Sequence, residues 1–422
     1  MQDNCNVGGS VASRSGVLTS RAAYQLPAPQ APRTLIAAAS WLPKADSDGF
    51  ERNVGVILLS YRRASRLTQQ QLADLLGFDR TYISMIERGR RSITDRGTLR
   101  HISRTLAIPP HVLGITGPDD ADFSAMLSFG TSVIRLADTA RHAGRAAEAA
   151  SELWPLITRL ETRIASGHAE GEAVRLLAQA PVSFGVTLGH LLPEEQMATA
   201  ARRTGLALLL AGDLGDRTLL ASVLRMHGNE LRKAGHAAAA VTRLRQSLQL
   251  DDHPGRRGAA LVLLARAAAQ SGQADLFDTV TAQCVQALKA DEEHEVFFNA
   301  FTVREVRIRG LLATGRTKEA VDLVESFAAE ESPPTPQWRV IERVTTADAL
   351  ARAGDEHAAV SMLSAAVSDA ETLRLPHQVQ RIIRLTDQSG ELRNQAVRMQ
   401  AQAALTRLER QLTEATSALR TS

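Results

Sequence analysis

The 422-residue sequence predicts an all-α fold in which a small five-helix bundle precedes a long α-solenoid of paired helices. Hydrophobic residues make up 44% of the chain but aromatic residues only 4%, and this Ala-, Leu- and Val-rich composition is typical of packed helices. Apolar residues recur at helical spacing between residues 50 and 117. Beyond residue 118, a glycine-centred pattern recurs and indicates repeated helix pairs. We therefore divide the chain into residues 1–49, 50–117 and 118–422.

Residues 1–49 are rich in Ser, Ala, Pro, Gly and Gln, a composition that predicts a disordered segment. One open interpretation is that the apolar stretch at residues 35–42 docks on the rest of the chain. A second open interpretation is that the start codon is over-extended, that is, assigned too far upstream. A third is that the segment is an arm that touches DNA through Arg14, Arg21 and Arg33.

Apolar spacing and turn residues predict the helices of the bundle at residues 50–65, 69–76, 80–88, 95–106 and 111–115. Thr68 with Gln71 forms a capping-box pattern at the start of the second helix, and Gly77 is suited to end it in a left-handed conformation. Asp79 is the expected cap of the third helix, and Gly89 closes it. The side chains expected in the core are Val54, Ile57, Leu58, Tyr61, Leu72, Leu75, Leu76, Ile83, Ile86, Leu99, Ile102 and Leu106.

The segments LTQQQLADLLG, YISMIERGRR and TLRHISRTLAIPPHVLGI resemble the phage repressor/Cro-like helix-turn-helix family, also called the xenobiotic-response-element type. The resemblance covers about sixty-five residues and implies DNA binding. The charge distribution agrees with DNA binding by this segment. Residues 51–117 hold 11 arginines against five acidic residues, whereas residues 118–422 carry a net charge of −4.

A recognition helix presents its N-terminal residues to base edges, and here these are Arg80, Thr81, Ser84 and Met85. Arg80 suits a bidentate contact with guanine, and Thr81 suits a hydrogen bond or a thymine methyl. The residues expected to contact phosphates are Gln69, Gln70, Tyr82, Arg88, Arg90 and Arg91. The resemblance also implies a structural ion pair between Arg62 and Glu87.

The pattern beyond residue 118 consists of a small residue, then glycine seven positions later, then alanine five positions after that. Its central glycines are Gly235, Gly272, Gly315 and Gly354, spaced by 37, 43 and 39 residues, with a divergent early copy at residues 143–150 and Gly390 following. The pattern resembles tetratricopeptide repeats, although Ile308 and Phe277 depart from its small-residue rule and the repeats are unusually long. An unrelated array of helices remains the alternative.

In such an array the first helix of each pair lines the concave face. The resemblance therefore implies a ligand groove lined by Arg225, Asn229, Lys233, Arg266, Glu305, Arg309, Asp348 and Arg352. Asn229 offers a donor and an acceptor to a peptide backbone, and Arg266 and Arg309 suit a carboxylate. An unliganded, solvated face remains open. The final helix, residues 391–419, carries Leu405, Leu412 and Leu419 every seven residues, which predicts either a solenoid cap or a dimer seam.

Several function classes lack support in the sequence. Cys5 and Cys284 cannot build a disulfide framework, so a reducing cytoplasm is the expected location, and no run of 18 apolar residues predicts a membrane span. No P-loop, dinucleotide-binding glycine motif or nucleophile elbow occurs, so we expect neither an enzyme nor a cofactor. The DEEHE run at residues 291–295 gathers possible metal ligands on one helical turn, but no metal site is expected there.

The sequence therefore favours a dimeric DNA-binding transcriptional regulator with a palindromic operator. Its resemblance to peptide-sensing quorum-type regulators implies that the repeats bind a small peptide and set the geometry of the two DNA readers. The alternative is an interaction scaffold, in which the solenoid binds another protein and the helix-turn-helix only tethers it to DNA.

Overall fold

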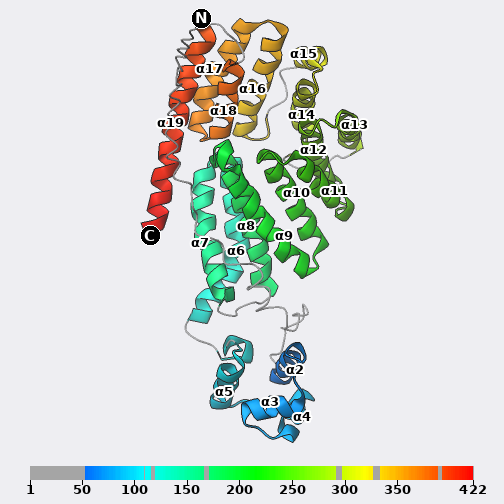
Figure 1. The fold of residues 1–422 in the computed structure, drawn as a ribbon, viewed down its shortest axis with the longest axis vertical. Coiled ribbons are helices and arrows are strands. Elements are labelled where there is room, and N and C mark those ends of the chain that lie inside the picture. Colours follow the sequence, from blue (N-terminus) through cyan, green and yellow to red (C-terminus); the bar gives the residue numbers. More distant parts are fainter. Residues whose placement is uncertain are drawn as a thin grey trace, which may run out of the picture.

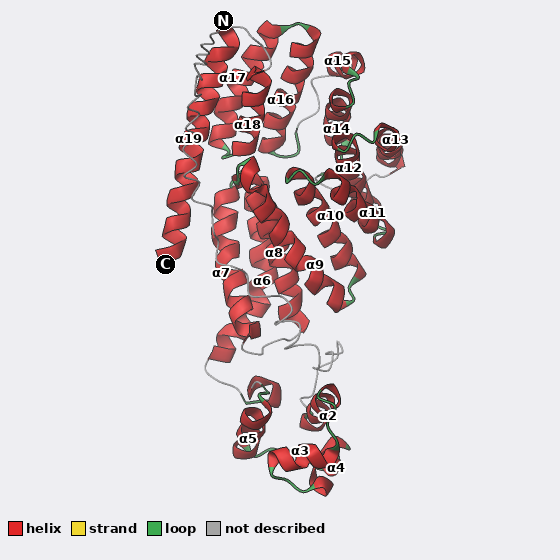
Figure 2. Cartoon of the chain, viewed as in Figure 1, coloured by secondary structure: helices red, strands yellow, loops and turns green. Residues whose placement is uncertain are grey.

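The computed structural model describes residues 53–108, 110–115, 119–165, 171–290, 297–326, 333–387 and 392–421. Every regular element among them is helical, as predicted (Figure 2). Figure 1 shows a small bundle, α2 to α5, beyond one end of a long helical body. The predictions for residues 1–49 lie outside the described residues.

The N-terminal bundle comprises α2 (Val54–Ala64), α3 (Gln69–Leu76), α4 (Arg80–Glu87), α5 (Arg96–Leu106) and a 3₁₀ turn, η1 (Pro110–Leu113). Their buried faces meet in one core that contains Ile57, Leu72, Ile83 and Ile102. The prediction for Leu75 was wrong, because its side chain is 52% exposed. The eight-residue α3 buries Leu72, Ala73 and Leu76, and Leu75 lies off that stripe.

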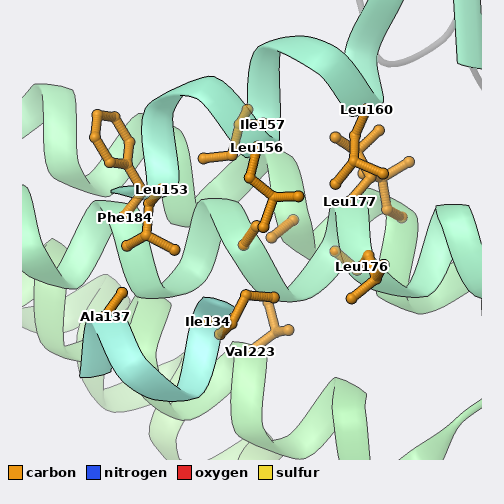
Figure 3. Packing of buried hydrophobic residues seen from close by; sticks show 14 of the residues in the cluster. Ile134, Ala137, Leu153, Leu156, Ile157, Leu160, Leu176, Leu177, Phe184 and Val223 are labelled. Carbon is orange, nitrogen blue, oxygen red and sulfur yellow. The ribbon is translucent and has the colours of Figure 1, made fainter. Parts of the chain in front are cut away.

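The body consists of antiparallel helix pairs, and its helices are α6 (Asp119–His142), α7 (Ala146–Ala165), α8 (Gly171–Leu191), α9 (Met197–Leu214), α10 (Arg217–Lys233), α11 (Ala237–Leu250), α12 (Pro254–Gln270), α13 (Ala274–Ala290), α14 (Ala300–Ala313), α15 (Thr317–Glu325), α16 (Pro336–Ala353), α17 (Glu356–Thr372), α18 (Pro376–Asp387) and α19 (Leu392–Thr421). A short 3₁₀ helix, η2 (Glu194–Gln196), precedes α9. Helices α6 to α10 share one hydrophobic core, and Figure 3 shows part of it, with labelled side chains from α6, α7, α8 and α10.

The predicted repeat glycines make the turns within the pairs. Gly235, Gly272, Gly315 and Gly354 all adopt positive φ, between 74° and 91°, and so does Gly144 in the early copy, with φ of 82°. Phe277 stands where the repeat pattern expects a small residue, and the structure shows how its large side chain is accommodated. A Cβ at Gly310 would lie 2.0 Å from the Phe277 ring, so a glycine on α14 makes room for the large side chain on α13.

The array curves until its ends meet. Gln337 of α16 donates a hydrogen bond to the carbonyl oxygen of Arg141 on α6 at 3.3 Å, and Gln380 of α18 bonds the backbone N–H of Glu194 at 2.8 Å. Arg384 adds an ion pair to Glu194. Figure 1 shows α16 to α18 lying against the ends of α6 to α8. Contacts between residues nearly 200 positions apart thus close the concave face.

The last helix, α19, covers the end of the array. Val397, Ala401, Ala404 and Leu408 are buried against α17 and α18, while Leu412 packs against the core of α6 to α10. Most of the described apolar side chains of α19 are therefore used within the chain, which agrees with the predicted solenoid cap. The side chain of Leu419 lies outside the described residues.

Candidate functional site

The turn between α3 and α4 sets the orientation of α4. Thr68 and Gln71 form the predicted capping box at the start of α3, and Gly77 ends that helix with φ of 68°. Asp79 caps α4 by accepting a 2.6 Å hydrogen bond from the backbone N–H of Thr81. Hydrogen bonding with Thr81 lowers the pKa of Asp79. Asp79 is therefore a charged cap at neutral pH.

A buried ion pair attaches α4 to α2. The Arg62 guanidinium donates to both carboxylate oxygens of Glu87, with Nε–Oε1 at 2.6 Å and Nη2–Oε2 at 2.9 Å. Gln69 of α3 adds a 2.8 Å bond from its amide nitrogen to the same carboxylate. The Glu87 side chain is only 3% exposed. Three helices thus converge on one carboxylate, and none of these groups is available to read a base.

One close backbone contact was not predicted from the sequence. A Cβ at Gly55 of α2 would lie 2.1 Å from the carbonyl oxygen of Ile86 on α4, so the two helices touch at a position where only glycine fits. Asn53 caps α2 by accepting from the Gly55 N–H at 3.0 Å. The Asn-Val-Gly order was the only signal for this contact, and isolated glycines inside a helix are too common to be diagnostic.

The residues predicted to read bases lie together on α4. Arg80 and Thr81 are exposed at its first turn, and Ser84 and Met85 are half-buried one turn later. Arg80 makes no hydrogen bond or ion pair with any residue that the structure describes. Its guanidinium is therefore available to a partner outside the chain.

The predicted phosphate contacts surround α4 but differ in availability. Arg88, Arg90 and Arg91 are exposed beyond its C-terminal end, and the Arg91 guanidinium lies 4.8 Å from the centroid of the Tyr82 ring. The Gln70 amide bonds Asp74 at 2.8 Å. Because the Gln69 amide nitrogen is engaged by Glu87, a phosphate at the start of α3 would meet the backbone N–H groups of Gln69 and Gln70.

The comparison with known families identifies this part of the chain. Residues 55–119 match the family model of a helix-turn-helix domain. The match covers α2 to η1 and ends at the first residue of α6, so it describes the N-terminal bundle alone. No curated protein matches the chain. The helix-turn-helix domain presents α4 as its second, recognition helix, and domains of this kind are typical of DNA-binding regulators.

A second candidate site lies on the concave face of the body, where the ends of the array meet. It is a cavity of about 230 Å³ lined from α6, α8, α10, α12, α14, α16 and α18. Five of the predicted groove residues line it, namely Arg225, Asn229, Lys233, Arg266 and Arg309. Asp348 and Arg352 line a smaller cavity of about 180 Å³ that shares Arg266 and Arg309 with the first.

The prediction that Glu305 faces the groove was wrong. Its side chain is 1% exposed, lies beneath the cavity wall and accepts a 2.9 Å hydrogen bond from the Thr345 hydroxyl. Position in a repeat predicted which helix faces inward, but α14 is covered nearly all round, so a single face could not be assigned from spacing. Glu305 therefore supplies buried negative charge behind the cavity and does not line it.

Two histidines in the cavity were missed by the sequence reasoning. His190 of α8 and His377 of α18 both line it. Burial and the positive charge of Lys233 lower the pKa of His377 to about 3, and the same causes lower the pKa of His190. Both rings are therefore neutral at physiological pH. No signal in the sequence joins them, because 187 positions separate the two residues and only closure of the array brings them together.

Two further observations limit other roles. The described residues include no group of three or more His, Cys, Asp or Glu side chains placed to hold a metal ion. The DEEHE run lies outside the described residues. Within the same part of the chain, no helix has both the length and the apolar character needed to cross a membrane.

Proposed function

We propose that the protein is a sequence-specific, dimeric transcriptional regulator whose helical body senses a small ligand. The observation that carries this proposal is the first turn of α4, where Arg80 and Thr81 are exposed on a helix fixed by Asp79 and by the Arg62–Glu87 pair. The exposed Thr81 side chain offers a hydroxyl for a hydrogen bond and a methyl group that can meet a thymine methyl. Arg80 supplies the hydrogen-bond donors for guanine.

Selection from a random library of double-stranded DNA tests this function. The purified full chain is expected to enrich one motif that contains a guanine read by Arg80, arranged as two inverted half-sites. The Arg80→Ala protein, selected in parallel, serves as the control and is expected to enrich no motif. Recovery of unrelated sequences by the wild-type protein would contradict the regulator assignment.

Dimerisation is proposed because a single reader contacts few bases, and paired helix-turn-helix units occupy successive major grooves about 34 Å apart. The surface that we assign to this role lies on α6. Phe129 and Leu136 are 66% and 68% exposed, seven residues apart on one face, with Val133 between them. A second copy of this chain is the proposed occupant, because α6 follows the helix-turn-helix domain directly and pairing through it would fix the distance between two readers.

The ligand is proposed to bind in the closed cavity, and the resemblance to peptide-sensing regulators makes a short peptide the reference ligand. Helices from both ends of the array line this cavity, so a bound molecule would stabilise one curvature of the body. A shift in curvature requires different affinity for the two shapes. Because α6 connects the body to the reader, such a shift would alter the spacing of the two α4 helices.

A protein-binding scaffold is less well supported. An extended partner needs an open concave face, whereas hydrogen bonds that involve the side chains of Gln337 and Gln380 join the two ends of this array. The cavity, which is partly open and has a volume of about 230 Å³, suits a small molecule or a very short peptide. The proposed role of the body is therefore sensory and non-catalytic.

A further inference from the structure

The cavity between the two ends of the body is strongly cationic. Its lining includes seven arginines and one lysine, which are Arg141, Arg225, Arg232, Lys233, Arg266, Arg309, Arg381 and Arg384. Within the described part of the chain, Glu194 is the one acidic residue of the lining, and it pairs with Arg384. So many like charges around one small space repel one another unless an anion lies among them.

Carboxylates that lie outside the cavity lining balance part of this positive charge. Lys233 pairs with Glu230 at 2.9 Å, and Arg141 pairs with Asp138 at 3.0 Å. The Arg309 guanidinium is 3.8 Å from Glu305. These carboxylates lie outside the lining, so they hold the cations in place without filling the space in front of them.

Arg232 and Arg266 have no carboxylate within ion-pair distance among the described residues. Arg232 is 6% exposed and donates only to neutral oxygens, those of Gln270 at 3.2 Å and Asn229 at 3.0 Å. The Arg266 guanidinium lies 5.7 Å from the centroid of the Trp338 ring. Burial and the neighbouring Arg232 and Arg309 lower the pKa of Arg266 well below its usual value, and the buried Glu305 offsets this effect only in part.

Two arginines that line the cavity each have a nitrogen without a hydrogen-bond acceptor. Arg232 Nε and Arg309 Nη1 are buried and make no hydrogen bond within the described part of the chain. A buried donor without an acceptor is costly, and buried charged groups in native proteins are normally paired. The unpaired nitrogens belong to α10 and α14 and both residues line the cavity. An anion placed in the cavity would lie beside arginines from two repeats.

Another part of the lining is apolar. Trp338 and Ile341 of α16 and Met226 of α10 contribute to it, together with Val262, Leu263 and Phe297. Trp338 is buried and packs edge-on against Phe301, so its ring is held in place. The cavity thus combines a fixed hydrophobic wall with arginine donors, as sites for small organic acids and phosphorylated compounds do.

We propose that the ligand of this cavity is a small organic anion with at least two negative charges, bound by Arg232, Arg266 and Arg309, with its apolar part against Trp338. Carboxylates and phosphates share the chemistry that these arginines recognise. The inference rests on the proposed function only in taking the body as the sensory part. It narrows the ligand from any small molecule or peptide to a polyanion.

Isothermal titration calorimetry of the DNA-free full chain tests the proposal, with citrate and pyrophosphate as probes and sodium chloride adjusted to equal ionic strength. We expect at least one probe to bind, and the better probe distinguishes carboxylate from phosphate chemistry. Arg266→Met and Arg309→Met, which keep an apolar stem, should each weaken binding by about tenfold or more, because each removes a charge-assisted hydrogen bond. Arg245→Met is the matched control, since Arg245 is exposed on α11 outside the lining.

Thermal melting of the same ligand-free proteins provides a second readout. If Arg266 only supports the fold, its substitution lowers the melting temperature, whereas removal of a charge without a carboxylate partner from a repelling cluster is expected to leave the melting temperature unchanged or to raise it. The proposal is overturned if neither probe binds the wild-type chain, or if all four proteins bind with equal affinity. Because no DNA is present, these outcomes are independent of whether an operator is found.

Discussion

Replacement of Arg80 by alanine is expected to abolish specific operator binding while leaving the fold intact. Arg80 is exposed at the first turn of α4 and makes no hydrogen bond or ion pair with a described residue, so its removal costs the bundle little. A bidentate arginine–guanine contact discriminates by about 1–3 kcal/mol, and a dimer loses two of them. Specific affinity should therefore fall by roughly 100-fold or more, towards the affinity for unrelated DNA.

Fluorescence anisotropy titrations with the selected sequence and with a scrambled duplex measure this effect. Arg104→Ala is the control, because Arg104 is likewise exposed but lies in the last turn of α5. It should reduce affinity for the two duplexes alike, if at all. Equal operator affinity for wild-type and Arg80→Ala proteins would show that α4 does not read the operator through its first turn.

Replacement of Arg62 by methionine is expected to destabilise the helix-turn-helix domain by about 1–3 kcal/mol, the cost typical of leaving a buried polar group without its partner. The Glu87 carboxylate, 3% exposed, would retain only the Gln69 amide as a side-chain partner. Hydrogen exchange of peptides from residues 53–108 measures the effect without interference from the body. Arg63→Met, a substitution of the exposed neighbour, is the control. Identical exchange in the two variants would contradict a structural role for the pair.

The pH dependence of the domain follows from the same pair. Burial acts to raise the pKa of Glu87, but hydrogen bonds from Arg62 and Gln69 outweigh it and hold the pKa below its usual 4.5. A carboxylate with a depressed pKa in the folded state stabilises the fold above its unfolded pKa, and this contribution is lost as pH falls through the folded value. The wild-type domain should therefore lose protection in acid below about pH 4.5, and Arg62→Met should lack this part of the acid sensitivity.

Local rules were sufficient to predict the helix-turn-helix domain. Thr68, Gly77 and Asp79 each have one conformational role that depends only on near neighbours, and the structure places all three as predicted. Leu75 was misassigned because an eight-residue helix has too few apolar positions to define its buried face. The Gly55–Ile86 contact was missed because it depends on how closely two helices approach, which spacing does not encode.

The cavity could be predicted only in part. Repeat position identified Arg225, Arg266 and Arg309, since each lies on the first helix of its pair. His190 and His377 were missed because they meet only when the array closes, and the amount of curvature depends on many small packing angles. Glu305 shows the same limit, because a helix covered on nearly all sides has no face that the sequence marks as the groove.

The central claim is that the body fixes the distance between two DNA readers, and altered half-site spacing tests it most directly. Binding is measured to duplexes in which the two selected half-sites are kept or separated by five additional base pairs, which is about half a helical turn. We predict tight binding at one spacing and a loss on the order of 100-fold or more after the insertion. The variant with both Phe129→Asp and Leu136→Asp should bind the two duplexes equally and weakly. Equal affinity of the wild-type protein for both duplexes, or for a lone half-site, would contradict the account.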